Sequence, residues 1–335
     1  PLRKHPAAGH GVPPPPGGTR GPLVAPAPQR GSISPGRGVP GASVGATAVR
    51  LHHSPVYALP TAGPPGVALV LTVHDLAADV HPEGLSLRHR AAFRRTFRSA
   101  AAADRVIAVS ETTRRDLLGR YAVDPGRVVV VPNGVSPALA VASEEGAASR
   151  WPRPFVLYVG GLDRLKNVDF LLGVVARCRR EGLGLHLVAA GEEGPRRERL
   201  LGAAGALGLA DAVVAPGRLT DADLAAAYRG AAAFVFPSRY KGFGLPPLEA
   251  MAAGCPVVSS PAGALREVLG GAALLVGPDD EPGWAGAIAA LLRDAGLRRE
   301  RIAAGRERAA AHTWEASARR TLDAYRAAIG GGGAR

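Results

Sequence analysis

The residues best suited to chemistry in this chain of 335 amino acids gather in one stretch, Phe236 to Val258. It reads Phe-Pro-Ser-Arg-Tyr-Lys-Gly-Phe-Gly-Leu-Pro-Pro-Leu-Glu-Ala-Met-Ala-Ala-Gly-Cys-Pro-Val-Val. An apolar strand, a glycine-bearing turn and prolines at a helix start would place backbone N–H groups and the positive end of a helix at one point. Such a point favours an anionic ligand, and phosphate is the usual one.

Glu249 lies one turn into this expected helix and should face the same crevice. A carboxylate there can accept two hydrogen bonds from the hydroxyl groups of a ribose. On physical grounds alone, the alternative is a structural turn with Glu249 as a surface charge.

A second block with chemical potential runs from Tyr158 to Leu172 and reads Tyr-Val-Gly-Gly-Leu-Asp-Arg-Leu-Lys-Asn-Val-Asp-Phe-Leu-Leu. It falls at a strand-to-helix turn, where its cations could neutralise an anionic group such as a phosphate without a metal. A solvated lysine near a helix start is the plainer alternative. The chain has three lysines, and two of them, Lys166 and Lys241, fall in these blocks. Either chance or a need for a compact ammonium explains this placement.

The first half of the chain carries a smaller candidate, Thr72-Val-His-Asp-Leu, at the end of an apolar run. This position puts His74 and Asp75 at the carboxyl edge of a parallel sheet, where α/β proteins bind their ligands. A structural hydrogen bond is the alternative role for a lone histidine at a strand end.

The elements that position these residues follow an alternating pattern from about residue 51 onward. Short apolar runs alternate with amphipathic, charge-bearing stretches, which predicts an α/β fold with parallel sheets flanked by helices. Six apolar runs in the second half predict one complete doubly wound domain. Strands are expected at 67–73, 105–109, 128–131, 155–159, 185–190, 212–215, 233–236, 256–258 and 273–276, and helices in the first half at 88–102 and 111–121.

The domain organisation follows from shifts in composition. Residues 1–50 hold 11 Pro and 10 Gly without any acidic residue, which predicts disorder. A polar, small-residue stretch ending in Trp-Pro-Arg-Pro predicts an interdomain linker at 137–154. These two segments leave a first domain at 51–136 and a second domain at 155–312. The last helix, 313–330, is expected to pack back onto the first domain.

Composition argues against several classes of protein. No apolar run approaches the roughly 18 residues needed to span a bilayer, and no signal segment opens the chain, which favours a cytoplasmic protein. Cys178 and Cys255 lack metal or disulfide spacing and are expected to be buried thiols. The net charge of +13 is weak evidence for nucleic acid, because no aromatic platform or known module accompanies it.

One basic segment, residues 88–98, stands out within this charge. It combines arginines with Phe93 and Phe97 in a helical pattern that could rest on the inner face of an anionic membrane. A solvated helix face is the alternative. The arginines are Arg88, Arg90, Arg94, Arg95 and Arg98.

The block that contains Glu249 resembles the retaining glycosyltransferases of family 4, whose members carry Glu-Gly-Phe-Gly-Leu-Pro-x-Leu-Glu-Ala-Met-Ala. The resemblance implies a GT-B fold of two Rossmann-like, doubly wound domains facing a cleft, with the N-terminal one truncated. It makes residues 51–136 the partial acceptor-side domain and residues 155–312 the nucleotide-sugar-binding domain. It implies donor-binding roles for Gly161, Lys241, Gly242, Phe243, Gly244, Leu245 and Glu249, and catalytic roles for His74, Arg164 and Lys166.

Two positions depart from the family pattern. Lys241 stands where the family has its first glutamate. The family arginine is commonly found at the position of Gly161 or immediately before Lys166. Arg164 is therefore a displaced candidate for its role.

The function implied by the resemblance is transfer of a hexose from a nucleoside diphosphate sugar to a hydroxyl of a glycan or lipid-linked acceptor. The His-Asp-Leu form is similar to bacterial mannosyltransferases of surface polysaccharides, so GDP-mannose is the leading donor and a UDP-hexose the second. Neither a cofactor, a metal nor a nucleic-acid partner is expected. The alternative is a donor-binding pseudoenzyme or inactive fragment, because residues 1–50 lack the first strand and glycine-rich loop of relatives.

Overall fold

The computed structural model describes residues 49–55, 59, 65–83, 86–136 and 151–331. Nearly all of the segment predicted to be disordered, and residues 137–150 of the predicted linker, lie outside the described residues. Those two expectations therefore stay predictions.

The first half of the described chain forms a parallel sheet with the strand order β1-β2-β3-β4. The central strand β2 is buried along its whole length, because helices cover a parallel sheet on both faces. Three of these strands were predicted from their apolar runs, whereas β1 was not, since its sequence is Leu-His-His-Ser. The strands are β1 (Leu51–Ser54), β2 (Ala68–Val73), β3 (Arg105–Ala108) and β4 (Val128–Val130).

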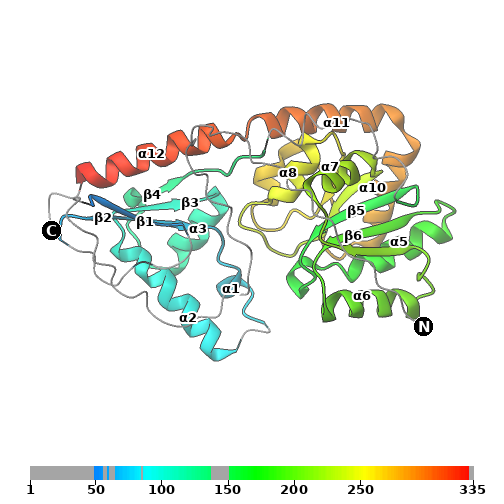
Figure 1. Cartoon of the computed structure of the whole chain (residues 1–335), viewed down its shortest axis with the longest axis horizontal. Coiled ribbons are helices and arrows are strands. Elements are labelled where there is room, and N and C mark those ends of the chain that lie inside the picture. Colours follow the sequence, from blue (N-terminus) through cyan, green and yellow to red (C-terminus); the bar gives the residue numbers. More distant parts are fainter. Residues whose placement is uncertain (1–48, 56–58, 60–64, 84–85, 137–150, 332–335) are drawn as a thin grey trace, which may run out of the picture. The chain divides into compact units, whose positions relative to one another are not determined.

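Alternate residues of β2 face two different layers, as the pleat of a strand requires. Leu69 and Leu71 pack in one cluster with Phe97 and Leu117 from helices on their side. Ala68 and Val70 face the opposite side, which α12 (Trp314–Gly331) covers (Figure 1). The helices of the first layer are α1 (Ala77–Val80), α2 (Leu87–Arg98), η1 (Ser99–Ala102) and α3 (Glu111–Arg120), with η2 (Pro125–Arg127) leading into β4.

The second sheet has the strand order β10-β9-β8-β5-β6-β7, with every pair parallel. This order confirms the predicted doubly wound domain: the winding reverses between β5 and β8, and ligands bind beside such a reversal. The strands are β5 (Phe155–Gly160), β6 (His186–Gly191), β7 (Val213–Gly217), β8 (Ala233–Phe236), β9 (Val257–Ser259) and β10 (Leu274–Leu275).

Helices on both faces of this sheet enclose the larger core. Both cysteines are buried in it, as predicted, and burial raises the pKa of Cys178 to about 11 and that of Cys255 to about 12. The helices are η3 (Arg164–Lys166), α5 (Phe170–Arg180), α6 (Pro195–Ala206), α7 (Asp221–Gly230), α8 (Leu245–Ala252), α9 (Leu265–Leu269), η4 (Gly270–Ala272), α10 (Glu281–Arg293) and α11 (Ala295–Ala310).

The chain segments that leave and rejoin the first sheet lie side by side. The backbone N–H of Val135 donates to the carbonyl of His312 at 2.9 Å, and Val135 pairs with Thr313 in a parallel bridge. A side chain at Gly134 would collide with the backbone of Thr313 and Trp314. Gly134 therefore has a structural role, because only a residue without Cβ permits this approach.

Helix α2 buries its aromatic face within the protein. Phe97 is fully buried, stacks with Phe93 and meets the ring of Tyr121 at 5.6 Å. Contact of this helix with an anionic membrane stays a prediction. Its arginines remain at least partly exposed. In the part of the chain that the structure describes, no helix combines the length and apolar character needed to cross a bilayer.

Candidate active site

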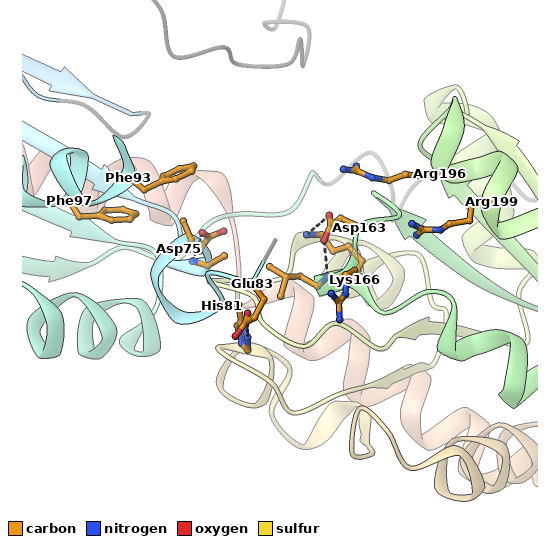
Figure 2. Close-up of a pocket in the computed structure, with 13 residues that line it drawn as sticks. Asp75, His81, Glu83, Phe93, Phe97, Asp163, Lys166, Arg196 and Arg199 are labelled. Atoms are coloured by element: carbon orange, nitrogen blue, oxygen red, sulfur yellow. Dashed lines mark hydrogen bonds and ion pairs between the residues drawn. The ribbon is translucent and has the colours of Figure 1, made fainter. Parts of the chain in front are cut away.

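The candidate site is a cavity of about 550 Å³ at the carboxyl ends of β2 and β5 (Figure 2). Loops follow these strands directly, so their polar side chains reach the sheet edge where ligands of α/β proteins bind. Of the predicted residues, Arg164 and Lys166 line this cavity. The full lining is Asp75, Ala77, Ala78, His81, Glu83, Phe93, Phe97, Asp163, Arg164, Leu165, Lys166, Arg196 and Arg199.

A short turn fixes the position of Lys166. Asp163 caps η3 by accepting the N–H of Leu165 at 3.0 Å, and its other oxygen lies 3.2 Å from the Lys166 ammonium. Asn167 ends the turn in the left-handed region at φ 57°, held by a 2.8 Å bond from its amide to the carbonyl of Pro278. The turn directs the ammonium into the cavity and leaves Arg164 exposed.

The loop around Gly161 is held by two neighbouring side chains. The carbonyl of Gly161 accepts the hydroxyl of Tyr158 at 2.6 Å, and Glu192 accepts the N–H of Leu162 at 2.6 Å. Burial, and then the charges of Asp163 and Glu192, raise the pKa of Tyr158 well above its ordinary value. Tyr158 therefore stays a neutral donor, and the loop is rigidly placed beside β6.

The glycine-bearing loop before α8 contacts the first half of the chain directly. The carbonyl of Gly242 accepts hydrogen bonds from two buried side chains, Ser110 at 2.7 Å and Thr113 at 3.2 Å. A Cβ at Gly242 would collide with the carbonyl of His74. Glycine is therefore required here for close approach of two backbones.

The remaining residues of this loop shape the start of α8. Gly244 caps the helix at φ 116°, a value that favours glycine, and Leu245 is the first helical residue. Phe243 is buried with its ring 5.9 Å from that of His312. Within α8, Glu249 is partly buried and accepts the hydroxyl of Tyr228 at 3.1 Å.

Lys241 belongs to the same loop and is partly buried. Its ammonium lies 5.7 Å from the centre of the Phe236 ring. Burial is the main cause that lowers the pKa of Lys241 to about 8; the charge of Lys166 lowers it as well, whereas Asp75 and Asp163 oppose the shift. The folded chain thus brings Lys166 and Lys241 close together, with the carboxylates of Asp75 and Asp163 beside them.

His74 follows β2 and is held by its surroundings. Its Nε2 donates to the carbonyl of Pro55 at 2.8 Å. Its backbone lies against Gly242, so the predicted catalytic histidine borders the predicted donor loop. Asp75 next to it lines the cavity (Figure 2).

A carboxylate of the second half also holds the start of α3. Glu267 of α9 accepts the N–H of Glu111 at 2.8 Å and both the N–H and the hydroxyl of Thr112 at 3.0 Å. Ser110 caps the same helix by accepting the N–H of Thr113 at 3.0 Å. A negative charge at a helix N-terminus is favourable, so this contact stabilises the approach of α3 to the loop at Gly242.

Comparison with known proteins shows the family and the fold of this chain. The family described as Glycosyltransferase Family 4 matches residues 44–139, and the one described as Glycosyl transferases group 1 matches residues 153–294. The solved sucrose-phosphate synthase from Thermosynechococcus elongatus is 30% identical with a TM-score of 0.67, over 78% of this chain and 67% of that one. The chain belongs to glycosyltransferase family 4. Its two parallel sheets have the GT-B fold.

Other family members and structural relatives match about two thirds or more of this family 4 chain. A D-inositol 3-phosphate glycosyltransferase from Kineococcus radiotolerans is 35% identical over 68% of this chain and 58% of its own length. An MMP alpha-(1->4)-mannosyltransferase from Mycolicibacterium hassiacum is 36% identical over 67% and 54%. HepE from Anabaena, solved with UDP-glucose, has a TM-score of 0.65 at 20% identity, over 78% and 72%. This chain therefore spans less than two thirds of the length of these two sequence relatives.

Several residues of this family 4 site were missed by the sequence analysis. Asp163, Glu192 and Tyr228 each bond to a predicted site residue or its neighbour. Arg196 and Arg199 line the cavity from α6. Glu192 directly follows β6, and Asp163 lies in the loop after β5. Their position at the carboxyl edge of the sheet was the signal that could have identified them as site residues. Tyr228 lies on another helix, and nothing in its local sequence pointed to Glu249.

Proposed function

We propose that this protein transfers a hexose from a nucleoside diphosphate sugar to a hydroxyl group, with retention at the anomeric carbon. The observation that supports this most directly is Lys166, turned into a cavity beside the winding reversal of a doubly wound sheet. An ammonium there stabilises a diphosphate as it leaves. Glu249 is assigned to the ribose of the donor, and His74 to the transferred sugar.

In this proposal the reaction takes place on one face of the sugar. The bond from the anomeric carbon to the diphosphate oxygen breaks, and the acceptor oxygen forms its bond from the same side. The acceptor proton passes to the departing phosphate oxygen. Lys166, with Arg164, stabilises the negative charge that develops on this phosphate.

GDP-mannose is the favoured donor, and a UDP-hexose is the second. The His-Asp-Leu motif and the relative named a mannosyltransferase support mannose. The structural neighbour solved with UDP-glucose supports the second choice. The acceptor is assigned to the class of glycans or lipid-linked glycans, and the exposed arginines of α2 provide charge for contact with an anionic membrane.

The decisive experiment is calorimetric titration of the chain with GDP, GDP-mannose, UDP and UDP-glucose. One nucleotide series should bind, and Lys166→Ala and Glu249→Ala should each weaken it by about 10-fold to 100-fold, as expected for loss of a hydrogen bond to a charged group. Arg179→Ala, which removes a surface cation paired with Asp211 at 2.7 Å, is the matched control and should bind normally.

Two results would contradict the proposal in different ways. A folded protein that binds none of the four nucleotides has no donor site. Binding without release of nucleotide in the presence of glycan and lipid-linked acceptors would instead make the chain a donor-binding pseudoenzyme.

A further inference from the structure

Four charged groups from separate segments converge in front of the loop at Gly242. Lys241 precedes that glycine, Lys166 comes from η3, and Asp163 from the turn before it. Asp75 follows β2, and its Cβ lies 2.7 Å from the position that a Cβ on Gly242 would occupy. Lys166 pairs with Asp163 at 3.2 Å, and Lys241 is close enough to interact with the charges of Lys166, Asp75 and Asp163.

The backbone of Lys241 is fixed in this place. Its carbonyl accepts the N–H of Ala264 at 2.8 Å, and a side chain at Gly263 would collide with it. Tyr240 before it donates to Asp116 at 2.6 Å, and its ring lies 5.7 Å from that of His81. Lys241 is thus not a surface lysine that samples many positions.

The Lys241 ammonium is in an unfavourable environment when no ligand is bound. Burial removes part of its hydration, and the nearby Lys166 repels it, so its pKa falls to about 8 despite Asp75 and Asp163. A ligand with two or more negative charges between the lysines would reverse both effects. A diphosphate has this charge, and its oxygens can accept from both ammonium groups.

Gly161 has no side chain, so the facing loop places no cation at this position. A Cβ added there would meet Glu192 at 3.4 Å and Asp163 at 3.5 Å, which are ordinary contacts, and Gly161 is not among the glycines with positive φ. A Cβ therefore fits at this position, and a cationic side chain built on it would begin close to these two carboxylates.

We propose that Lys241 and Lys166 together bind the diphosphate of the nucleotide donor, so that Lys241 supplies from the α8 loop a second positive charge beside that of Lys166. This inference rests on the proposed function, because it takes the donor to be a nucleoside diphosphate sugar. It makes Lys241 a determinant of donor affinity and couples binding to a proton.

The sign of this coupling follows from the groups around Lys241. The charged form binds the diphosphate, and the bound anion raises the pKa of Lys241 above its value near 8. Donor binding therefore takes up a proton at higher pH. Between pH 6.5 and 8.5 the protonated fraction falls about fourfold, and the donor Kd should rise by about the same factor.

The test is calorimetric titration with GDP-mannose and UDP-glucose, whose esterified diphosphates do not titrate in this range. Lys241→Gln should weaken donor binding by at least tenfold at pH 6.5 and should abolish the pH dependence. Lys241→Glu should weaken it further, and Gly161→Arg added to Lys241→Glu should restore at least tenfold of the loss. Arg239→Gln is the matched control from the same loop, since Arg239 binds Asp279 at 2.8 Å, and should match wild type.

The outcomes separate this inference from the proposed function. If wild type binds nucleotide sugars, and Lys241→Gln binds equally well with the same pH dependence, the inference is wrong and the proposed function stands. If folded wild type binds none of them, both fail. Thermal melting of each variant shows that a loss of binding is not a loss of fold.

Discussion

Tyr228 is fully buried and donates a hydrogen bond to Glu249. Burial, together with the adjacent Glu249 carboxylate, raises the pKa of Tyr228 well above its ordinary value, so the phenol remains a hydrogen-bond donor. The bond occupies one carboxylate oxygen and restricts the rotation of Glu249. A ribose would then meet a carboxylate that is already oriented, which reduces the entropy lost on binding.

We expect Tyr228→Phe to weaken donor binding by about threefold to tenfold, since a hydrogen bond contributes about 1 kcal/mol. The substitution keeps the ring and its packing against Phe234. Calorimetry with the donor nucleotide measures the effect. Tyr121→Phe, which removes a hydroxyl bonded to Asp79 in the first half, is the control and should not change the affinity. An unchanged affinity in Tyr228→Phe would show that Glu249 needs no orientation.

At the scale of single elements, helix α3 depends on a carboxylate from α9. Glu267→Gln keeps the size of the side chain but removes the negative charge from the helix N-terminus. We expect the free energy of unfolding to fall by about 1–2 kcal/mol, from the weaker bonds to Glu111 and Thr112 and the lost dipole interaction. Urea denaturation measures this change.

The control for that substitution is Glu300→Gln on α11. Glu300 is exposed and pairs with its neighbour Arg301, so its loss should change stability by less than about 0.5 kcal/mol. Equal effects of the two substitutions would mean that Glu267 contributes only a surface charge.

The elements themselves could be predicted well because their signals are local. The strands β5 to β10 begin or end within a few residues of their predicted ranges, since each is a short apolar run between helical patterns. Strand β1 was missed because His52 and His53 interrupt its apolar pattern. Its stability comes from parallel pairing with β2 and from a 2.8 Å bond between His53 and Thr72, neither of which its own sequence displays.

The site was predicted less completely because its contacts join distant residues. The motifs identified Lys166, Glu249 and the glycines of the α8 loop. The partners of these groups lie on other elements: Tyr228 on α7, and Ser110 at the start of α3. Only the folded chain brings them together, and the same holds for the meeting of Lys241 with Asp75.

At the scale of the whole molecule, α12 completes the first sheet. Ala324 and Ala328 pack against Val70 and Ile107, and Tyr325 bonds to His53 at 2.7 Å. Ala328→Asp would place a carboxylate in this apolar layer. We expect a loss of at least about 3 kcal/mol in the free energy of unfolding, because a buried charge without a partner is costly.

The adjacent residue offers a matched control. Ala327 is exposed, whereas Ala328 is fully buried, so Ala327→Asp adds the same charge to the same helix without burying it. Denaturant titration of both variants should show a large loss only for Ala328→Asp. If Ala328→Asp and Ala327→Asp were equally stable, α12 would not pack against the sheet.

The contact between Val135 and Thr313 determines how this protein could be separated into fragments. The first half is assembled from two pieces of sequence, residues 51–136 and the helix that begins at Trp314. A gene fragment ending at residue 136 would encode the sheet without one of its covering layers. A fragment beginning at residue 151 would carry a helix whose apolar face has nothing to cover.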